Sequence, residues 1–295
     1  GSREGDPGRT ETVMKRLLIA GVVLAASFAG SGAVWADPVD DTLEIDGVPM
    51  ITRAKAPEGH PFDEVLSGWL FREAETRDVE RDTIENPGMI AVEDGETMWN
   101  TVEGTAGKSC ASCHNDAAET MKGVGAKFPK WDADSNKPIN IELQINKCRT
   151  EQMGAEALAF NKGGQQELTA YIKHQSLGMP VEIDLSEGDM QSWWEKGKDV
   201  YYTRTGQLNL ACASCHETAM GKFIRADHLS QGQVNGFPTY RLKSGLTSLH
   251  QRFRGCIRDT RAEQPKAFSD DLMALETFVT WRGTGLSVET PAVRQ

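Results

Sequence analysis

Two identical pentapeptides decide the fold of this chain: Cys110-Ala111-Ser112-Cys113-His114 and Cys212-Ala213-Ser214-Cys215-His216. The Cys-x-x-Cys-His pattern is the attachment signal of a c-type haem, in which the two thiols bond to the porphyrin and the adjacent histidine ligates the iron. One such motif alone could also be a redox dithiol or half of a zinc site. Two motifs, each with its own histidine, favour two covalently attached haem c groups.

The N-terminal segment has the features of an export signal. Residues 1–13 precede the first methionine, Met14, and we expect them to be a cloning remnant or an upstream mistranslation without a fold. A charged start at 15–16, an apolar run at 17–33 and a small-residue cleavage site at 34–36 follow. We therefore expect cleavage after residue 36, a periplasmic location and no retained membrane span.

Charge and cysteine usage narrow the functional class. The net charge of −11 argues against nucleic acid as a partner, and an anionic substrate would need a local basic patch. Six cysteines in an exported protein would ordinarily suggest three disulfides, but four of them belong to the two motifs. Cys148 and Cys256 remain to be explained.

The chain repeats itself. The motif cysteines, the Phe-Pro pairs at 128–129 and 237–238, and the cysteines at 148 and 256 recur in the same order at offsets of 102 to 109 residues. Such a repeat predicts a duplicated unit. We predict a mainly α fold with two tandem cytochrome c-like domains, residues 91–180 and 181–295, after an N-terminal extension at 37–90.

Apolar spacing and capping residues predict the helices. We expect one helix at 91–102 before the first motif, one starting at Ser186 before the second, and closing helices at 165–175 and 270–282. Between each motif and its later cysteine we expect mostly loop. Residues 62–77 are predicted to form a helix that packs across both domains or faces a partner subunit.

The second axial ligand of each iron is the next question. Methionine is the usual choice in electron-transfer cytochromes, but Met153, Met179 and Met220 do not recur in equivalent places. Cys148 and Cys256 do recur, so we predict that each thiolate ligates one iron. The alternative is a single disulfide between them.

Basic residues surround the second of these cysteines. Arg252, Arg254 and Arg258 lie within four residues of Cys256. Beside a haem-bound thiolate they favour an anion-binding substrate pocket over a solvated basic stretch. The four remaining histidines are interpreted as surface or satisfied core residues, although His250 could lie near the second haem; they are His60, His174, His228 and His250.

These features together resemble the SoxA family, the dihaem subunits of SoxAX cytochromes. The resemblance rests on the paired motifs, the later cysteine of each, the arginine four residues before Cys256 and the Asn-Pro-Gly-Met stretch at 86–89. It covers nearly all of residues 40–290.

The resemblance implies an L-cysteine S-thiosulfotransferase that oxidatively couples thiosulfate to a cysteine of the carrier SoxYZ and passes two electrons to the monohaem partner SoxX. It implies that His114 with Cys148, and His216 with Cys256, ligate the two irons. It also implies that Cys256 is the catalytic cysteine, found as a persulfide, and that Arg252 is the active-site arginine. Two alternatives stay open: a non-catalytic dihaem electron carrier, and a dihaem thiosulfate dehydrogenase that forms tetrathionate.

Overall fold

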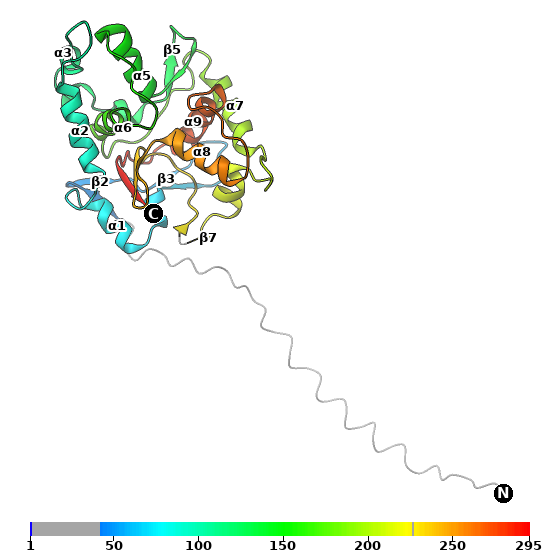
Figure 1. The fold of residues 1–295 in the computed structure, drawn as a ribbon. Helices are drawn as coiled ribbons and strands as arrows, with labels where there is room; N and C mark the ends of the chain where they lie inside the picture. Colours follow the sequence, from blue (N-terminus) through cyan, green and yellow to red (C-terminus); the bar gives the residue numbers. More distant parts are fainter. Residues whose placement is uncertain (2–41, 226) are drawn as a thin grey trace. The chain divides into compact units, whose positions relative to one another are not determined.

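A computed structural model describes Gly1, residues 42–225 and residues 227–295 (Figure 1). The expected export signal and its cleavage site lie outside the described residues. The residues from Thr42 to Gln295 belong to one compact unit. Its helices are α1 (Ala74–Arg81), α2 (Met89–Asn100), α3 (Ala111–His114), α4 (Ala117–Thr120), α5 (Ile141–Cys148), α6 (Gln165–His174), α7 (Met190–Tyr202), α8 (Leu249–Asp259) and α9 (Asp270–Arg282).

The strands are short and form small separate sheets. Four antiparallel pairs are β1 (Leu43–Ile45) with β2 (Val48–Met50), β3 (Arg53–Lys55) with β4 (Glu64–Leu66), β5 (Lys130–Asp132) with β6 (Lys137–Ile139), and β7 (Phe223–Ile224) with β8 (Asp227–His228). In the remaining sheet, β9 (Thr239–Arg241) pairs antiparallel with β10 (Gly245–Thr247) and parallel with the C-terminal β11 (Ala292–Arg294). Short helical turns complete the chain: η1 (Gly68–Phe71), η2 (Val124–Ala126), η3 (Arg149–Met153) and η4 (Ser214–Thr218).

Each half is built on a close pair of helices. In the first half α2 packs against α6, and a Cβ at Gly95 would collide with the backbone oxygen of Glu167. In the second half α7 packs against α9, and a Cβ at Gly197 would collide with the backbone oxygen of Ala274. Glycine lets the two backbones approach at both crossings, because any larger residue would force the helices apart.

The helices that carry the later cysteines begin in the same way in both halves. Asn140 caps α5 by accepting a hydrogen bond from the amide of Leu143 (3.0 Å), and Ser248 caps α8 by accepting one from the amide of Gln251 (3.3 Å). Each helix follows a hairpin, β5–β6 or β9–β10. Our expectation of mostly loop in these segments was wrong at the cysteines, since both lie on helices.

The bounds of the two closing helices were predicted well, but the start of the helix before the second motif was not. The helix at 270–282 has the predicted bounds, and α6 ends one residue before Gln175. The helix before the second motif begins at Met190 rather than at Ser186, because the Ser186 hydroxyl and amide bond to the Asp184 carboxylate instead of capping a helix.

The predicted helix at 62–77 does not form. Residues 64–66 are strand β4, residues 68–71 are a 3₁₀ turn, and α1 starts only at Ala74. Val65 and Trp69 are fully buried, so their apolar character comes from burial in a strand and a turn rather than from a helical face. The Ser67 hydroxyl accepts the amide hydrogen bond of Trp69, which fixes the turn after the strand (3.1 Å).

The extension packs against both halves, although not through the predicted helix. Trp69 lies in a cluster with Leu43, Ile45 and Met50, against which Leu177 of the first half packs. Toward the second half, the amide of Ile51 donates to the Ser287 hydroxyl (2.8 Å).

Buried polar contacts join the two halves directly. Glu276 of α9 accepts hydrogen bonds from the Asn140 side chain and from the His250 ring at one carboxylate oxygen, both at 2.9 Å. Because buried polar groups must be paired, these contacts fix how α5 and α8 meet α9.

Candidate functional site

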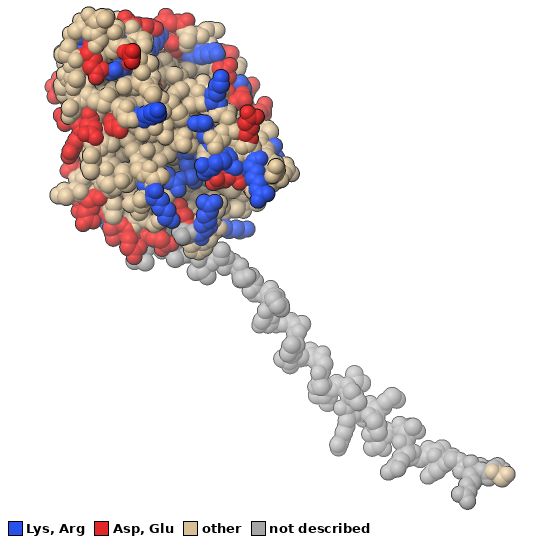
Figure 2. Space-filling model, in the orientation of Figure 1, with Lys and Arg blue, Asp and Glu red and all other residues tan. Residues whose placement is uncertain are grey.

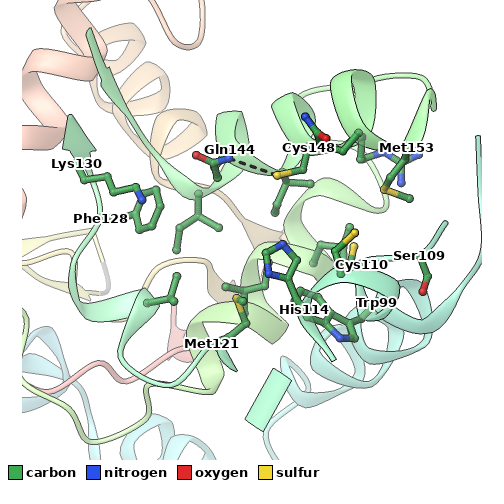
Figure 3. A pocket seen from close by; sticks show the side chains of 18 residues that line it. Trp99, Ser109, Cys110, His114, Met121, Phe128, Lys130, Gln144, Cys148 and Met153 are labelled. Atoms are coloured by element: carbon green, nitrogen blue, oxygen red, sulfur yellow. Dashed lines mark hydrogen bonds between the residues drawn. The ribbon is translucent and has the colours of Figure 1, made fainter. Parts of the chain in front are cut away.

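The first motif opens onto a large apolar cavity of about 330 Å³. Cys110, Cys113 and His114 line it from α3 and its N-cap, and Cys148 lines it from the end of α5. Figure 3 shows the Cys148 sulfur and the His114 imidazole facing the same space from these two elements. Apolar side chains form most of the remaining wall: Trp99, Met121, Val124, Phe128, Ile141, Ile145, Leu168 and Ile172.

These residues fit a haem c group. The donor set combines two thiols at the correct spacing, an imidazole and a separate thiol, and the wall is apolar as a porphyrin requires. Burial raises the pKa of the Cys110 thiol, and thioether formation would remove that ionisable group. The Trp99 indole donates a hydrogen bond to the carbonyl of Asn115, the residue after His114 (3.0 Å), and so anchors the end of the motif.

Cys148 has a hydrogen-bond donor one helical turn before it. The side-chain amide of Gln144 points its nitrogen at the Cys148 sulfur, at 3.3 Å (Figure 3). Met153, one of the methionines considered above, also lines this cavity. The sequence analysis missed Gln144, although its spacing from Cys148 matches the spacing of Arg252 from Cys256.

The second motif is also arranged for iron ligation. The carbonyl of Ser230 can only accept, so His216 donates to it from Nδ1 (2.9 Å) and leaves Nε2 free. Burial lowers the pKa of His216 to about 4, so that the imidazole is neutral near pH 7, as a ligand must be. Gly232 lies close against this ring, at a position where a Cβ would come within 2.8 Å of it.

Cys256 and Arg252 converge on the same place. Burial, and then the nearby Cys256, raise the pKa of Cys212 to about 12, and the same two causes raise the pKa of Cys215. Arg252 is close enough for its charge to lower the pKa of both His216 and Cys215. The haem-binding motif, the later cysteine and the arginine are thus brought together in the second half, as in a c-type site with an added cation.

The arginine cluster that we predicted around Cys256 does not form. Arg254 turns away, donating to the Pro265 carbonyl (3.1 Å), and Arg258 is exposed and pairs with Asp259 (3.1 Å). Helical geometry points them around the helix rather than to one side.

The cations near Arg252 come instead from distant segments. Burial and the charge of Arg252 lower the pKa of Arg241, on β9, where Cys256 acts in the opposite direction. Arg72, after η1 in the extension, has its pKa lowered to about 9 by burial and by the charges of Arg294 and Arg252. On the face drawn in Figure 2, basic side chains gather over α8 and β7, whereas acidic ones dominate near α1 and α2. The local basic patch that an anionic substrate needs is therefore present.

A buried ion pair fixes the second motif to α9. Arg282 is 1% exposed and donates to Glu217, the residue after His216, at 2.8 Å. The Tyr202 hydroxyl donates to the same carboxylate oxygen (2.9 Å). Sequence reasoning missed this pair because Arg282 and Glu217 are far apart along the chain.

The alternative ligands and cross-links find little support in the geometry. All six cysteines lie in the described part of the chain and are free, with Cys148 and Cys256 in different sites. His250 is buried, accepting from the Phe268 amide and donating to Glu276 (2.9 Å each), so both nitrogens are occupied. His250 is therefore a satisfied core residue, as are many buried histidines.

Comparisons with known proteins show the family of this chain. Residues 94–181 match the family model described as SoxA/TsdA, cytochrome c domain. A protein of Pseudaminobacter salicylatoxidans named L-cysteine S-thiosulfotransferase subunit SoxA is 70% identical over 96% of this chain and 100% of its own length. The chain belongs to the SoxA family. A Rhodovulum sulfidophilum SoxA of the same name is 47% identical over 96% of this chain and 99% of its own.

The fold comparison agrees. The crystal structure of SoxXA from P. pantotrophus matches with a TM-score of 0.83 and 47% identity, covering 88% of this chain and 100% of the matched chain. The cytochrome c-type SoxA fold predicted from the motifs is thereby confirmed. In the part of the chain that the structure describes, no helix is both long and apolar enough to cross a bilayer.

Proposed function

We propose that this SoxA chain is the thiosulfate-coupling subunit of an L-cysteine S-thiosulfotransferase, and that it carries two haem c groups in two tandem cytochrome c-like domains, residues 91–180 and 181–295. The observation that carries the proposal is the convergence of Cys256 and Arg252 on the second motif in a chain 70% identical to a named SoxA subunit. The extension at 37–90 and export to the periplasm after cleavage near residue 36 complete it.

The ligand set follows the two motifs. Cys110 and Cys113 would hold the first haem and Cys212 and Cys215 the second. Imidazole and thiolate then ligate each iron: His114 with Cys148, and His216 with Cys256. The shared cavity of the first set and the free Nε2 of His216 support this assignment.

The proposed reaction is a two-electron oxidation, so it needs an electron acceptor. A carrier cysteine thiolate and thiosulfate form one sulfur–sulfur bond, giving the carrier S-thiosulfonate and releasing two electrons. When bound, haem supplies an iron that accepts electrons one at a time. The electrons would leave through the haem of a SoxX partner, and the likeness to the SoxXA structure supports that partner. The carrier is SoxYZ, as the family resemblance implies.

The residues of this chain position the two sulfur partners. Arg252 offers a planar, always-charged donor for the thiosulfate oxygens, and Arg241 raises the local positive potential against the acidic protein. Cys256, as a thiolate or a persulfide, supplies a polarisable sulfur that could bond to the outer sulfur of thiosulfate with loss of two electrons, and that would leave again when the carrier thiolate attacks that sulfur. The proximity of Arg252 and Arg241 to Cys256 supports an anion-binding role.

Two measurements on the complex with SoxX test this proposal. Peptide mass spectrometry of Cys256 should reveal an added sulfur, whereas a Cys148–Cys256 cross-linked peptide would favour the electron-carrier alternative. Assayed with thiosulfate alone, the protein should oxidise little thiosulfate. Rapid tetrathionate formation without a carrier thiol would make the chain a thiosulfate dehydrogenase instead.

A further inference from the structure

The two later cysteines differ in the donor that stands one helical turn before them. Gln144 precedes Cys148 by four residues, and Arg252 precedes Cys256 by four. Both pairs lie on helices that follow a hairpin and start at a side-chain cap, so the two positions are structurally equivalent. On an α-helix, residues four apart share one face, which places each donor over its cysteine.

At the first site this placement produces a direct contact. The Gln144 nitrogen lies 3.3 Å from the Cys148 sulfur, and both side chains line the cavity that holds His114 and the motif cysteines (Figure 3). A thiolate can only accept, so the amide must present its NH₂ group. Gln144 lies on the preceding turn of α5, so helix geometry holds the donor in place.

A neutral donor and a charged donor have different consequences. A hydrogen bond to a metal-bound sulfur withdraws electron density from it, weakens its donation to ferric iron and raises the reduction potential. A neutral amide raises the reduction potential without attracting a dianion. The guanidinium at the equivalent position of the second site would raise the potential and also attract an anion. The first cysteine therefore has a neutral donor where the second has a charged one, although Arg149, which pairs with Glu103, and Lys130 also line the first cavity.

We propose that Gln144 is a positioning residue that fixes the Cys148 sulfur and raises the potential of the first iron. The inference rests on the proposed ligation of that iron by Cys148. Gln144 acts through Cys148 and does not touch the reacting sulfur atoms.

The test uses the complete complex with SoxX and removes only the donor. Gln144→Leu keeps a side chain of similar volume without the N–H group, and Gln144→Arg restores a donor. The control is Gln191→Leu, which removes an exposed glutamine that bonds to Glu195 one turn away in α7 (3.3 Å). Spectroelectrochemical titration and electron paramagnetic resonance report the potentials and the ligand field of both irons.

Gln144→Leu should shift one potential downward and alter one low-spin ferric signal, leaving the other unchanged. Gln144→Arg should return the shifted potential to the wild-type value or above it, and Gln191→Leu should change neither. If Gln144→Leu fails to assemble, Gln144→Glu of the same length should lower the same potential.

Two results would overturn the inference, and they are distinguishable. Unchanged potentials and spectra in the Gln144 variants, with a thiolate signature at both irons of the wild type, would show that the hydrogen bond has no effect. Absence of a thiolate signature at one wild-type iron would instead remove the ligand assignment on which the inference rests.

Discussion

Glu142, at the start of α5 where the two halves meet, is buried among ionisable groups. It is 7% exposed, and burial followed by repulsion from Glu276 raises its pKa from the ordinary value of 4.5 to about 7. A backbone hydrogen bond and the charge of Lys173 oppose the shift but do not cancel it. We predict that Glu142→Gln stabilises the protein in a pH-dependent way.

The direction in which pH changes the stability follows from proton linkage. Because the folded-state pKa lies above the unfolded value, the unfolded chain releases its proton first between pH 4.5 and 7, and stability falls as the pH rises through that window. A shift from 4.5 to about 7 at 1.36 kcal/mol per unit corresponds to about 3 kcal/mol. Glutamine never ionises, so the variant avoids this loss. The variant should be more stable than wild type by about 3 kcal/mol at pH 8 and by under about 0.5 kcal/mol at pH 4.5.

Urea unfolding of both proteins at pH 4.5 and pH 8, followed by tryptophan fluorescence, measures the difference. Glu93→Gln, an exposed carboxylate on α2, is the matched control and should give the same difference from wild type at both pH values. If the effect of Glu142→Gln is constant across this range, or if it is larger at pH 4.5, Glu142 does not hold a proton in the folded protein.

Two further predictions concern the second half. Arg252→Ala should lower kcat/KM with thiosulfate by roughly 10- to 100-fold, because a charge-assisted hydrogen bond is lost; the haem absorption spectrum should stay the same, and Arg258→Ala should leave turnover near wild type. Loss of haem in Arg252→Ala would show a structural role instead. Gly197→Ala should lower the free energy of unfolding by about 1–3 kcal/mol, because its Cβ would collide with the backbone of Ala274. In Gly163→Ala the new Cβ would meet nothing closer than 3.9 Å, so its unfolding in urea should match wild type.

The helices that the sequence predicted well carry local start and stop signals. The helix at 270–282 follows Ser269, opens with two acidic residues and ends at Gly283, and its bounds were predicted. The segment 62–77 has apolar residues at helical spacing, yet its strand pairs with residues 53–55. Periodicity in one segment cannot reveal a distant pairing partner, so this prediction failed.

The site residues also divide into those marked by local sequence signals and those brought together only by distant contacts. The motif residues and the later cysteines could be predicted because spacing and repetition mark them. Arg241 and Arg72 could not, since they come from a C-terminal sheet and from the extension, and only folding brings them near Arg252. Gln144 left a readable signal, its place four residues before Cys148, which the comparison of the two halves would have found.

The measurement that tests the central claim most directly is the mass of the carrier after reaction. The complex with SoxX is incubated with thiosulfate, the SoxYZ carrier and an electron acceptor, and the carrier is analysed by intact-protein mass spectrometry. The account predicts that the carrier cysteine gains one thiosulfate group with wild type and none with Cys256→Ser. Equal modification of the carrier by both proteins would contradict it.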